Sequence, residues 1–223
     1  MNIKLLIRAL TKYFVGLLMV MLLLFVPAGT LEYMNGWLFI GLLFIPMLAL
    51  GAVLLIKAPA LLEKRLNSKE KESEQKVVIS ISLIMFLGGF IVSALDYRFG
   101  WSDMPLAVVV IAAVVLVLSY AGYAEVMREN AYLSRTVEVQ ENQKVIDTGL
   151  YGIVRHPMYS VTTLLFLAIP LVLGSYIGFV IFLIYPVLLV KRIKNEEEVL
   201  EKGLTGYSEY KKKVKYRMIP FIW

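Results

Sequence analysis

One short stretch of the sequence holds the only histidine of the chain. It reads R-H-P-M-Y, from Arg155 to Tyr159, and lies where a polar, turn-rich segment meets a long apolar run. Two interpretations fit it. In the first, Arg155 reaches toward lipid phosphates, Pro157 begins a helix at its first turn, and His156 caps that helix. In the second, His156 belongs to a site at the boundary between membrane and water.

A second charged stretch reads K-R-I-K-N-E-E-E-V-L and runs from Lys191 to Leu200. On a helix, Arg192 and Glu196 are four residues apart and share one face. Charges at a membrane boundary cost enough to be candidates for function, although the same run could be a solvated helix end. If the two stretches meet, they form a pocket. Its members are Tyr151, Arg155, His156, Tyr159, Arg192, Glu196 and Glu197.

The composition limits the kinds of site available. There is no cysteine, which excludes a disulfide framework, a thiolate metal site and a cysteine nucleophile. One histidine cannot build a histidine-rich metal centre, so no metal site is predicted, although carboxylates could hold a hard cation. Hydrophobic residues make up 59% of the chain, against roughly 45 to 50% in soluble domains. With a mean hydropathy of +0.74, this predicts an integral membrane protein.

Membrane helices are the elements expected to position the two stretches. Two further apolar runs, Met158–Leu173 and Tyr176–Val190, are short and joined by Gly174 and Ser175, which predicts a tight helical hairpin over 158–190. The expected fold is all-α, a polytopic bundle of about six membrane segments. The four longer runs that approach the thickness of the hydrocarbon core are Tyr13–Val26, Trp37–Ile56, Val77–Leu95 and Pro105–Ala124.

Two polar connectors separate these segments. Lys57–Lys76 is charged and is expected to be a solvated amphipathic stretch at the membrane surface. Glu125–Arg155 is the longest polar stretch. Within it Thr136–Gln140 and Lys144–Thr148 surround E-N-Q and could form a short β-hairpin.

Basic residues are distributed very unevenly along the chain. If the N-terminus is cytoplasmic, 22 of the 23 lysines and arginines lie on the cytoplasmic side, and Arg98 is the exception. This places both termini and both large polar connectors in the cytoplasm. The net charge of +6 therefore reflects membrane topology, and no nucleic-acid partner is predicted. The pattern leaves the oligomeric state open.

Together the charged stretches resemble a known enzyme family. R-H-P-M-Y follows T-G-L-Y and precedes R-x-x-x-E-E-x-x-L, an order similar to the isoprenylcysteine carboxyl methyltransferase and phospholipid methyltransferase superfamily. The resemblance covers about Asn130 to Pro220 and divides the chain into four N-terminal spans, residues 1–124, and a catalytic region, residues 125–223. The tail residues that complete it are Tyr207, Tyr210, Val214, Ile219 and Pro220.

The resemblance implies an integral membrane methyltransferase that uses S-adenosylmethionine without a Rossmann domain. In that family the cofactor lies in a small cytoplasmic pocket over the C-terminal hairpin, closed by the tail. Carried over, Glu196 takes a polar group of the cofactor, while Arg192, facing the substrate, and Glu197, completing the glutamate pair, are the catalytic candidates. The other implied cofactor-binding residues are Gln143, Lys144, Val145, Ile146, Tyr151, Arg155, His156, Pro157, Met158 and Tyr159.

Three positions depart from the family's pattern. Many members have glycine where this chain has Val161, a position that bears on close approach of a helix or the cofactor. Many have histidine at the position of Gln143. The usual Phe-Gly before the first tail tyrosine is replaced by Gly203-Leu204-Thr205-Gly206.

The implied reaction is an in-line displacement, which needs alignment and a water-poor cavity more than a base or a metal. A carboxylate acceptor could be oriented by the planar fork of Arg192. An amine acceptor would lose a proton, for which Glu197 is the candidate. A pocket that opens into the bilayer would suit a lipid-like or small membrane-partitioned acceptor.

Two other functions remain open at this point. Sterol-reductase-like NADPH oxidoreductases share a similar C-terminal topology and an ending close to V-K-Y-R-M-I-P-F. A non-catalytic lipid-binding protein would use the same charges as interfacial anchors. Binding of S-adenosylmethionine, of NADPH or of neither separates the three.

Overall fold

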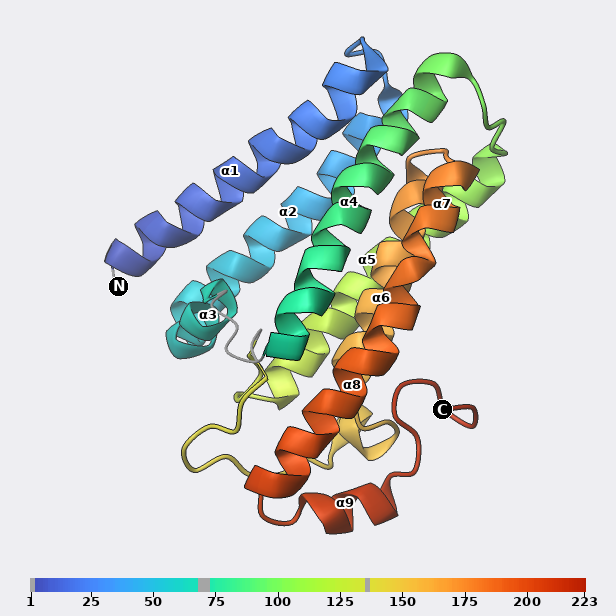
Figure 1. Ribbon diagram of the computed structural model, residues 1–223. Helices are drawn as coiled ribbons and strands as arrows, with labels where there is room; N and C mark the ends of the chain where they lie inside the picture. The colour runs from blue at the N-terminus through green and yellow to red at the C-terminus, as the bar shows by residue number, and fades with distance from the viewer. Residues whose placement is uncertain (1–2, 68–72, 135–136) are drawn as a thin grey trace.

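A computed structural model describes residues 3–67, 73–134 and 137–223, and this part of the chain is built from helices joined by irregular segments (Figure 1). The helices are α1 (Ile3–Ala28), α2 (Met34–Lys57), α3 (Pro59–Leu66), α4 (Ser73–Phe99), α5 (Leu106–Glu129), the 3-10 turn η1 (Gly149–Gly152), α6 (Pro157–Val172), α7 (Tyr176–Phe182), α8 (Ile184–Gly203) and α9 (Tyr207–Lys213).

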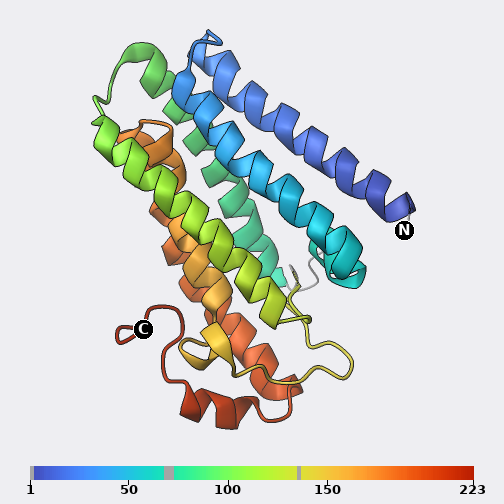
Figure 2. The ribbon, with the colours of Figure 1, turned by 180° about the vertical axis from the view of Figure 1, so that it is seen from behind.

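The long helices form a membrane bundle, as predicted. Among the described residues, five helical stretches are long and apolar enough to cross a membrane: α1, α2, α4 from Val77, α5 and the α7–α8 pair, whereas α6 is shorter. Seen from behind, α1, α2 and α5 form the near face, and the segment after α5 passes beneath the bundle (Figure 2). The expected all-α polytopic fold is confirmed.

The predicted C-terminal hairpin is present, and its tip reaches the far end of the bundle. There Tyr33 Oη donates to the carbonyl oxygen of Leu173 at 2.6 Å. Ser175 Oγ donates to Asp96 Oδ2 at 2.5 Å and accepts from the backbone N–H of Gly178 at 2.8 Å, so Ser175 also caps α7. The short helix α6, which is the first helix of the hairpin, therefore still reaches from the R-H-P-M-Y stretch to the α4–α5 connection.

Close packing holds the hairpin against α4 and α5. A Cβ added to Gly122 of α5 would lie 2.8 Å from Cγ1 of Val161, and one added to Gly89 of α4 would lie 2.3 Å from Cε2 of Phe182. Small residues at these crossings allow the helix backbones to approach closely. At Val161, where the family often has glycine, Gly122 on the opposing helix supplies the space.

The polar segment predicted as a β-hairpin has a different structure. Residues 137–148 contain no strand, and Thr136 lies outside the residues that the structure describes. Gln140 and Gln143 form a tight turn, with the Gln143 N–H 3.1 Å from the Gln140 carbonyl oxygen. Val139 and Val145 pack against the α8–α9 connection and do not pair as neighbouring strands. Tertiary packing of these partly buried valines takes the place of the strand pairing that their alternation suggested.

The first connector, Lys57–Lys76, is described up to Asn67, and residues 68–72 lie outside the described part of the chain. Its described part has a buried apolar side, as an amphipathic stretch should. Pro59 begins α3 at its first turn, and Leu61 and Leu62 are buried. Lys12 Nζ donates to the carbonyl oxygen of Leu66 at 2.5 Å, which ties α1 to the end of α3. The short helix is thereby fixed at the end of α2, at the same end of the bundle as the start of α4 (Figure 1).

Candidate active site

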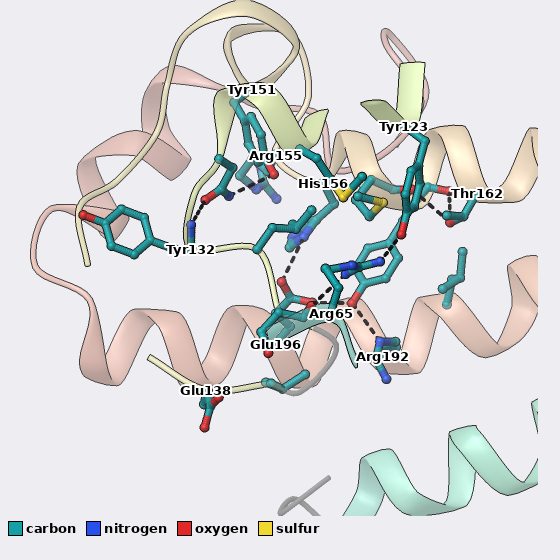
Figure 3. A pocket seen from close by; sticks show the side chains of 18 of the residues that line it. Arg65, Tyr123, Tyr132, Glu138, Tyr151, Arg155, His156, Thr162, Arg192 and Glu196 are labelled. Carbon is teal, nitrogen blue, oxygen red and sulfur yellow. Dashed lines mark hydrogen bonds and ion pairs between the residues drawn. The ribbon is translucent and has the colours of Figure 1, made fainter. Parts of the chain in front are cut away.

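One cavity of about 820 Å³ connects the charged end of the hairpin with the interior of the helix bundle. Its polar end is formed by the segment after α5, η1, the start of α6, α8 and α9 (Figure 3). Its other end is apolar and lies among membrane helices. The apolar lining includes Leu43, Met47 and Leu50 of α2, Val78, Leu83 and Phe86 of α4, and Leu165 and Phe166 of α6.

Most of the residues that the sequence indicated line this cavity. They are Gln143, Lys144, Val145, Ile146, Tyr151, Arg155, His156, Met158, Tyr159, Arg192 and Glu196. Two do not. Pro157 is buried at the first turn of α6, and Glu197 is buried behind the wall, only 3% exposed.

Tyr159 joins the two charged residues that the hairpin brings together. Its Oη donates to Glu196 Oε2 at 2.5 Å and accepts from Arg192 Nε at 2.8 Å (Figure 3). His156 Nδ1 lies 3.8 Å from the other oxygen of Glu196. Because Arg192 and Glu196 are one helical turn apart on α8, the phenol lies between them and fixes both side chains at the cavity.

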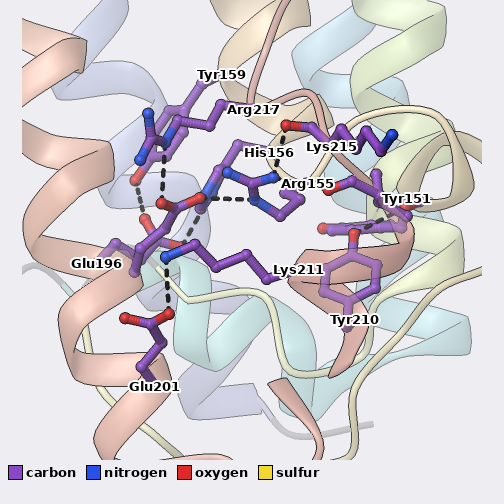
Figure 4. Close-up of polar contacts among 12 residues, drawn as sticks. Tyr151, Arg155, His156, Tyr159, Glu196, Glu201, Tyr210, Lys211, Lys215 and Arg217 are labelled. Carbon is purple, nitrogen blue, oxygen red and sulfur yellow. Dashed lines mark hydrogen bonds and ion pairs between the residues drawn. The ribbon is translucent and has the colours of Figure 1, made fainter. Parts of the chain in front are cut away.

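Glu197 accepts hydrogen bonds from three basic side chains. Arg155 Nε donates to Oε1 at 2.7 Å and Arg217 Nε to Oε2 at 2.9 Å, while His156 Nε2 lies 3.3 Å from Oε1 (Figure 4). Both oxygens of this buried carboxylate therefore already have basic partners. A carboxylate enclosed in this way is a poor proton acceptor.

Arg155 also fastens the C-terminal tail to the site. Its Nη1 donates to the carbonyl oxygens of Val214 at 2.7 Å and Lys215 at 2.8 Å. The backbone N–H groups of Arg155 and His156 donate to the carbonyl oxygens of Tyr216 and Arg217 at 2.9 and 2.8 Å. These bonds close the back of the polar end with the tail (Figure 4).

Three tyrosines outside the membrane helices complete the polar wall. Asn130 Nδ2 donates to Tyr151 Oη at 2.9 Å, and Tyr210 Oη donates to the backbone carbonyl oxygen of Tyr151 at 2.7 Å. Tyr207 is 4% exposed, and within the part of the chain that the structure describes its hydroxyl has no hydrogen-bond partner. Burial raises the pKa of Tyr207, with the nearby charge of Glu197 acting in the same direction, so the phenol keeps its proton.

Sequence reasoning did not identify several of these lining residues as part of the site. Tyr207 and Tyr210 were recognised as tail residues without a role, although their place in the family's motif was a usable signal. Arg65 and Tyr123 also line the cavity, and no local pattern marked either of them. They come from α3 and α5, which meet only in the folded chain.

Comparison with known proteins identifies the same region. Residues 105–205, rather less than half of the chain, match the family model described as phospholipid methyltransferase. The mouse protein named delta(14)-sterol reductase TM7SF2 is 31% identical over 91 residues, which is 40% of this chain and 22% of that protein. The uncharacterized protein YpbQ of Bacillus subtilis is 32% identical over 93 residues, 41% of this chain and 55% of YpbQ.

The family match runs from the start of α5 to the end of α8 and so contains η1, the R-H-P-M-Y stretch, the hairpin and both glutamates. The chain spans about a fifth of the mouse relative and about half of the bacterial one. The resemblance indicated by the motifs is confirmed for this segment, because residues 105–205 match the phospholipid methyltransferase family model.

Proposed function

We propose that this protein transfers a methyl group from S-adenosylmethionine to a lipid-like acceptor. The observation that carries the proposal is that one continuous cavity is polar beneath the tail and apolar among the membrane helices. Its volume of about 820 Å³ falls within the range of roughly 300 to 1,000 Å³ that is usual for ligand pockets. Such a cavity can hold a water-soluble cofactor at one end and an apolar acceptor at the other.

The residues of the polar end suit a cofactor with a cationic sulfonium and several polar groups. Tyr207 offers a buried hydroxyl that lacks a partner among the described residues, and a bound polar group would satisfy it. Tyr151 and Tyr159 add aromatic rings that can face a cation, and Glu196 adds a carboxylate. We assign cofactor binding to these residues together with the backbone of Gln143 to Ile146.

When bound, the cofactor supplies an activated methyl group, and the protein's task is alignment. Arg192, held by Tyr159, orients the acceptor from the side of α8. The tail fastened by Arg155 limits access of water to the polar end. If the acceptor has to lose a proton, Glu196 suits that role better than Glu197, because Glu196 lines the cavity and Glu197 is enclosed by basic groups.

A reductase that binds NADPH is the second candidate, and the match to the mouse protein named as a sterol reductase favours it. The family match over residues 105–205 favours the methyltransferase. A reductase would need a nicotinamide cofactor in the same polar end. Cofactor binding therefore decides between the two.

The test uses the purified full chain in lipid nanodiscs. Equilibrium binding of S-adenosylmethionine and of NADPH is measured first. Methyl-labelled S-adenosylmethionine is then supplied with a membrane lipid extract and the labelled product is identified. Saturable binding of NADPH without binding of S-adenosylmethionine would reject the methyltransferase.

Two variants locate the cofactor. Glu196→Gln should weaken binding of S-adenosylmethionine at least about tenfold, as expected for loss of a hydrogen bond to a charged group, and His156→Ala should weaken it as well. Glu198→Gln is the matched control, because Glu198 is exposed on the same helix and does not line the cavity. Unchanged affinity in both site variants, with thermal midpoints that show intact folding, would overturn the assignment.

A further inference from the structure

The cavity has a cationic residue that lies outside the segment shared with the family. Arg65 is on α3, forty residues before the family match begins at residue 105. It lines the cavity together with Tyr123 of α5 (Figure 3). Its Nη2 donates to Tyr123 Oη, and its Nη1 donates to the carbonyl oxygen of Ser134 at 3.2 Å. Its guanidinium carbon lies 5.4 Å from the centre of the Tyr123 ring.

The position of Arg65 is determined by several contacts of its short helix. Leu61 and Leu62 are buried beneath the bundle, and Lys64 Nζ donates to Gln140 Oε1 on the segment after α5. Lys12 holds the last carbonyl group of α3. With the C-terminal end and the apolar side of α3 held in this way, Arg65 has a defined place in the cavity wall rather than the freedom of a surface side chain.

Arg65 differs from Arg155 in how its charge is balanced. Arg155 is paired with the buried Glu197 at 2.7 Å. Arg65 donates to a phenol and to a carbonyl oxygen, and among the residues that the structure describes it has no carboxylate partner. A partly buried guanidinium with neutral partners leaves its charge available to an anion, for which its planar donors are well shaped.

Arg65 also lies at the border between the two ends of the cavity. Tyr123, which it contacts, packs in one cluster with Leu50 and Leu54 of α2 on the apolar side. The same cluster contains Tyr151 and Ile146 of the polar end. A lipid whose chain lies along α2 and α4 would present its headgroup at this border.

Resting on the proposed function, we propose that Arg65, oriented by Tyr123, binds an anionic group, a carboxylate or a phosphate, on the headgroup of the methyl acceptor. The acceptor is then an anionic or zwitterionic amphiphile, held by Arg65 from α3 and by Arg192 from α8. In this proposal Arg65 helps to select the acceptor. It does not need to contact the methyl group that is transferred. The other carboxylate that could occupy the site is that of the cofactor, and the experiment separates the two sources.

The test measures competition for the cavity without cofactor. Protein in detergent is photolabelled with a diazirine-bearing stearate, and labelled peptides that line the cavity are quantified by mass spectrometry. Oleate, oleyl phosphate and oleyl alcohol are the competitors. In the unmodified protein the two anions should compete at least about tenfold better than the alcohol, as expected for a hydrogen-bonded charge. No preference for the anions in the unmodified protein would overturn the proposal.

Variants then assign the preference to Arg65. Arg65→Gln should bring the anions to within about threefold of the alcohol, and Arg65→Lys should retain part of the preference. Tyr123→Phe, which leaves the arginine in place, should reduce the preference less and in the same direction. Arg128→Gln is the control, because Arg128 is exposed and paired with Glu125 outside the cavity.

The affinity for S-adenosylmethionine is measured on the same variants. Under the proposal, Arg65→Gln should bind S-adenosylmethionine with unchanged affinity. If Arg65→Gln weakened cofactor binding and left the competition unaltered, Arg65 would serve the cofactor's carboxylate and the proposal would be overturned. A full anion preference in both Arg65→Gln and Tyr123→Phe would overturn it as well. Failure of the unmodified protein to bind S-adenosylmethionine would instead reject the proposed function, and the competition result would stand separately.

Discussion

Glu196 and Glu197 are neighbours in the chain and have different environments in the fold. Successive residues of an α-helix point about 100° apart, so only one of the two can face the cavity. Glu196 does so beside Tyr159, while Glu197 is enclosed by Arg155, His156 and Arg217. Glu196 is therefore placed where the proposed ligands could reach it, whereas Glu197 holds the tail and the R-H-P stretch together.

Replacing Glu197 should test that structural role. Glu197→Gln leaves the surrounding basic groups without a counter-charge, and we expect it to lower the free energy of unfolding by about 3 kcal/mol at neutral pH, the lower end for a broken buried pair. Glu198→Gln, an exposed neighbour, should change stability little. Thermal unfolding in detergent checks both. A Glu197→Gln protein as stable as the unmodified one would contradict the role.

In the proposed function, Arg192 is the residue that orients the methyl acceptor. Its Nε is held by Tyr159, and its guanidinium carbon lies 5.8 Å from the centre of that ring. Lysine keeps the charge but loses the planar fork, so Arg192→Lys should reduce turnover at least about tenfold while cofactor affinity stays within about twofold. Methyl transfer and cofactor binding are measured on the same preparation. Nearly full turnover would reduce Arg192 to an interfacial anchor.

At the scale of elements, the α7–α8 limb is positioned by its fit against α4. Gly89 faces the ring of Phe182, whereas a Cβ added at the adjacent Gly88 would meet nothing within 4 Å. The two adjacent glycines therefore differ, because Gly89 lies at the close helix crossing and Gly88 faces open space. Because α8 carries Arg192 and Glu196 on the same limb, the crossing at Gly89 also positions the site.

The two glycines form a matched pair for mutation. Gly89→Ala should destabilise the protein by about 1 to 3 kcal/mol, since the methyl group would overlap the Phe182 ring. Gly88→Ala should be neutral or stabilising by up to about 1 kcal/mol through helix propensity. Thermal midpoints in detergent and turnover are compared for both. Equal effects of the two substitutions would show that the α4–α7 crossing is loosely packed.

At the scale of the whole molecule, the two ends of the bundle differ in charge. The N-terminus, α3, α9 and the segment after α5 lie at one end, while Arg98 is at the other, where its Nη1 donates to the carbonyl oxygen of Pro27 at 3.4 Å (Figure 1). The positive-inside rule assigns the first end to the cytoplasm. The cavity would then take its cofactor from the cytoplasmic side.

Cysteine labelling can test this orientation cleanly because the chain has no cysteine of its own. Lys4→Cys and Lys144→Cys should react with a membrane-impermeant maleimide in inside-out vesicles only, and Arg98→Cys in right-side-out vesicles only. Labelling Lys4→Cys and Lys144→Cys from opposite sides would contradict the topology. Labelling of both of these cysteines only in right-side-out vesicles would show that the orientation is the reverse of the one predicted.

The sequence by itself determined the features that depend on neighbouring residues. Apolar runs determined the membrane helices, since each such run must satisfy its own backbone hydrogen bonds in lipid. Gly174 and Ser175 between two short runs determined the hairpin, and the hairpin in turn brought R-H-P-M-Y beside the charged part of α8. That topological inference accounts for the predicted lining residues Tyr151, Arg155, His156, Tyr159, Arg192 and Glu196, whereas Gln143 to Ile146 and Met158 were implied only by the family resemblance.

The tertiary structure decided what depends on segments distant in the chain. The burial of Glu197 requires Arg217 from the tail, and the place of Arg65 in the cavity requires α3 to be fixed under α5. The alternation within residues 137–148 indicated strands, but Val139 and Val145 bury themselves against the α8–α9 connection. Such contacts join residues far apart in sequence, so their energies appear in no local pattern, and only the folded chain determines which of several compatible partners each side chain meets.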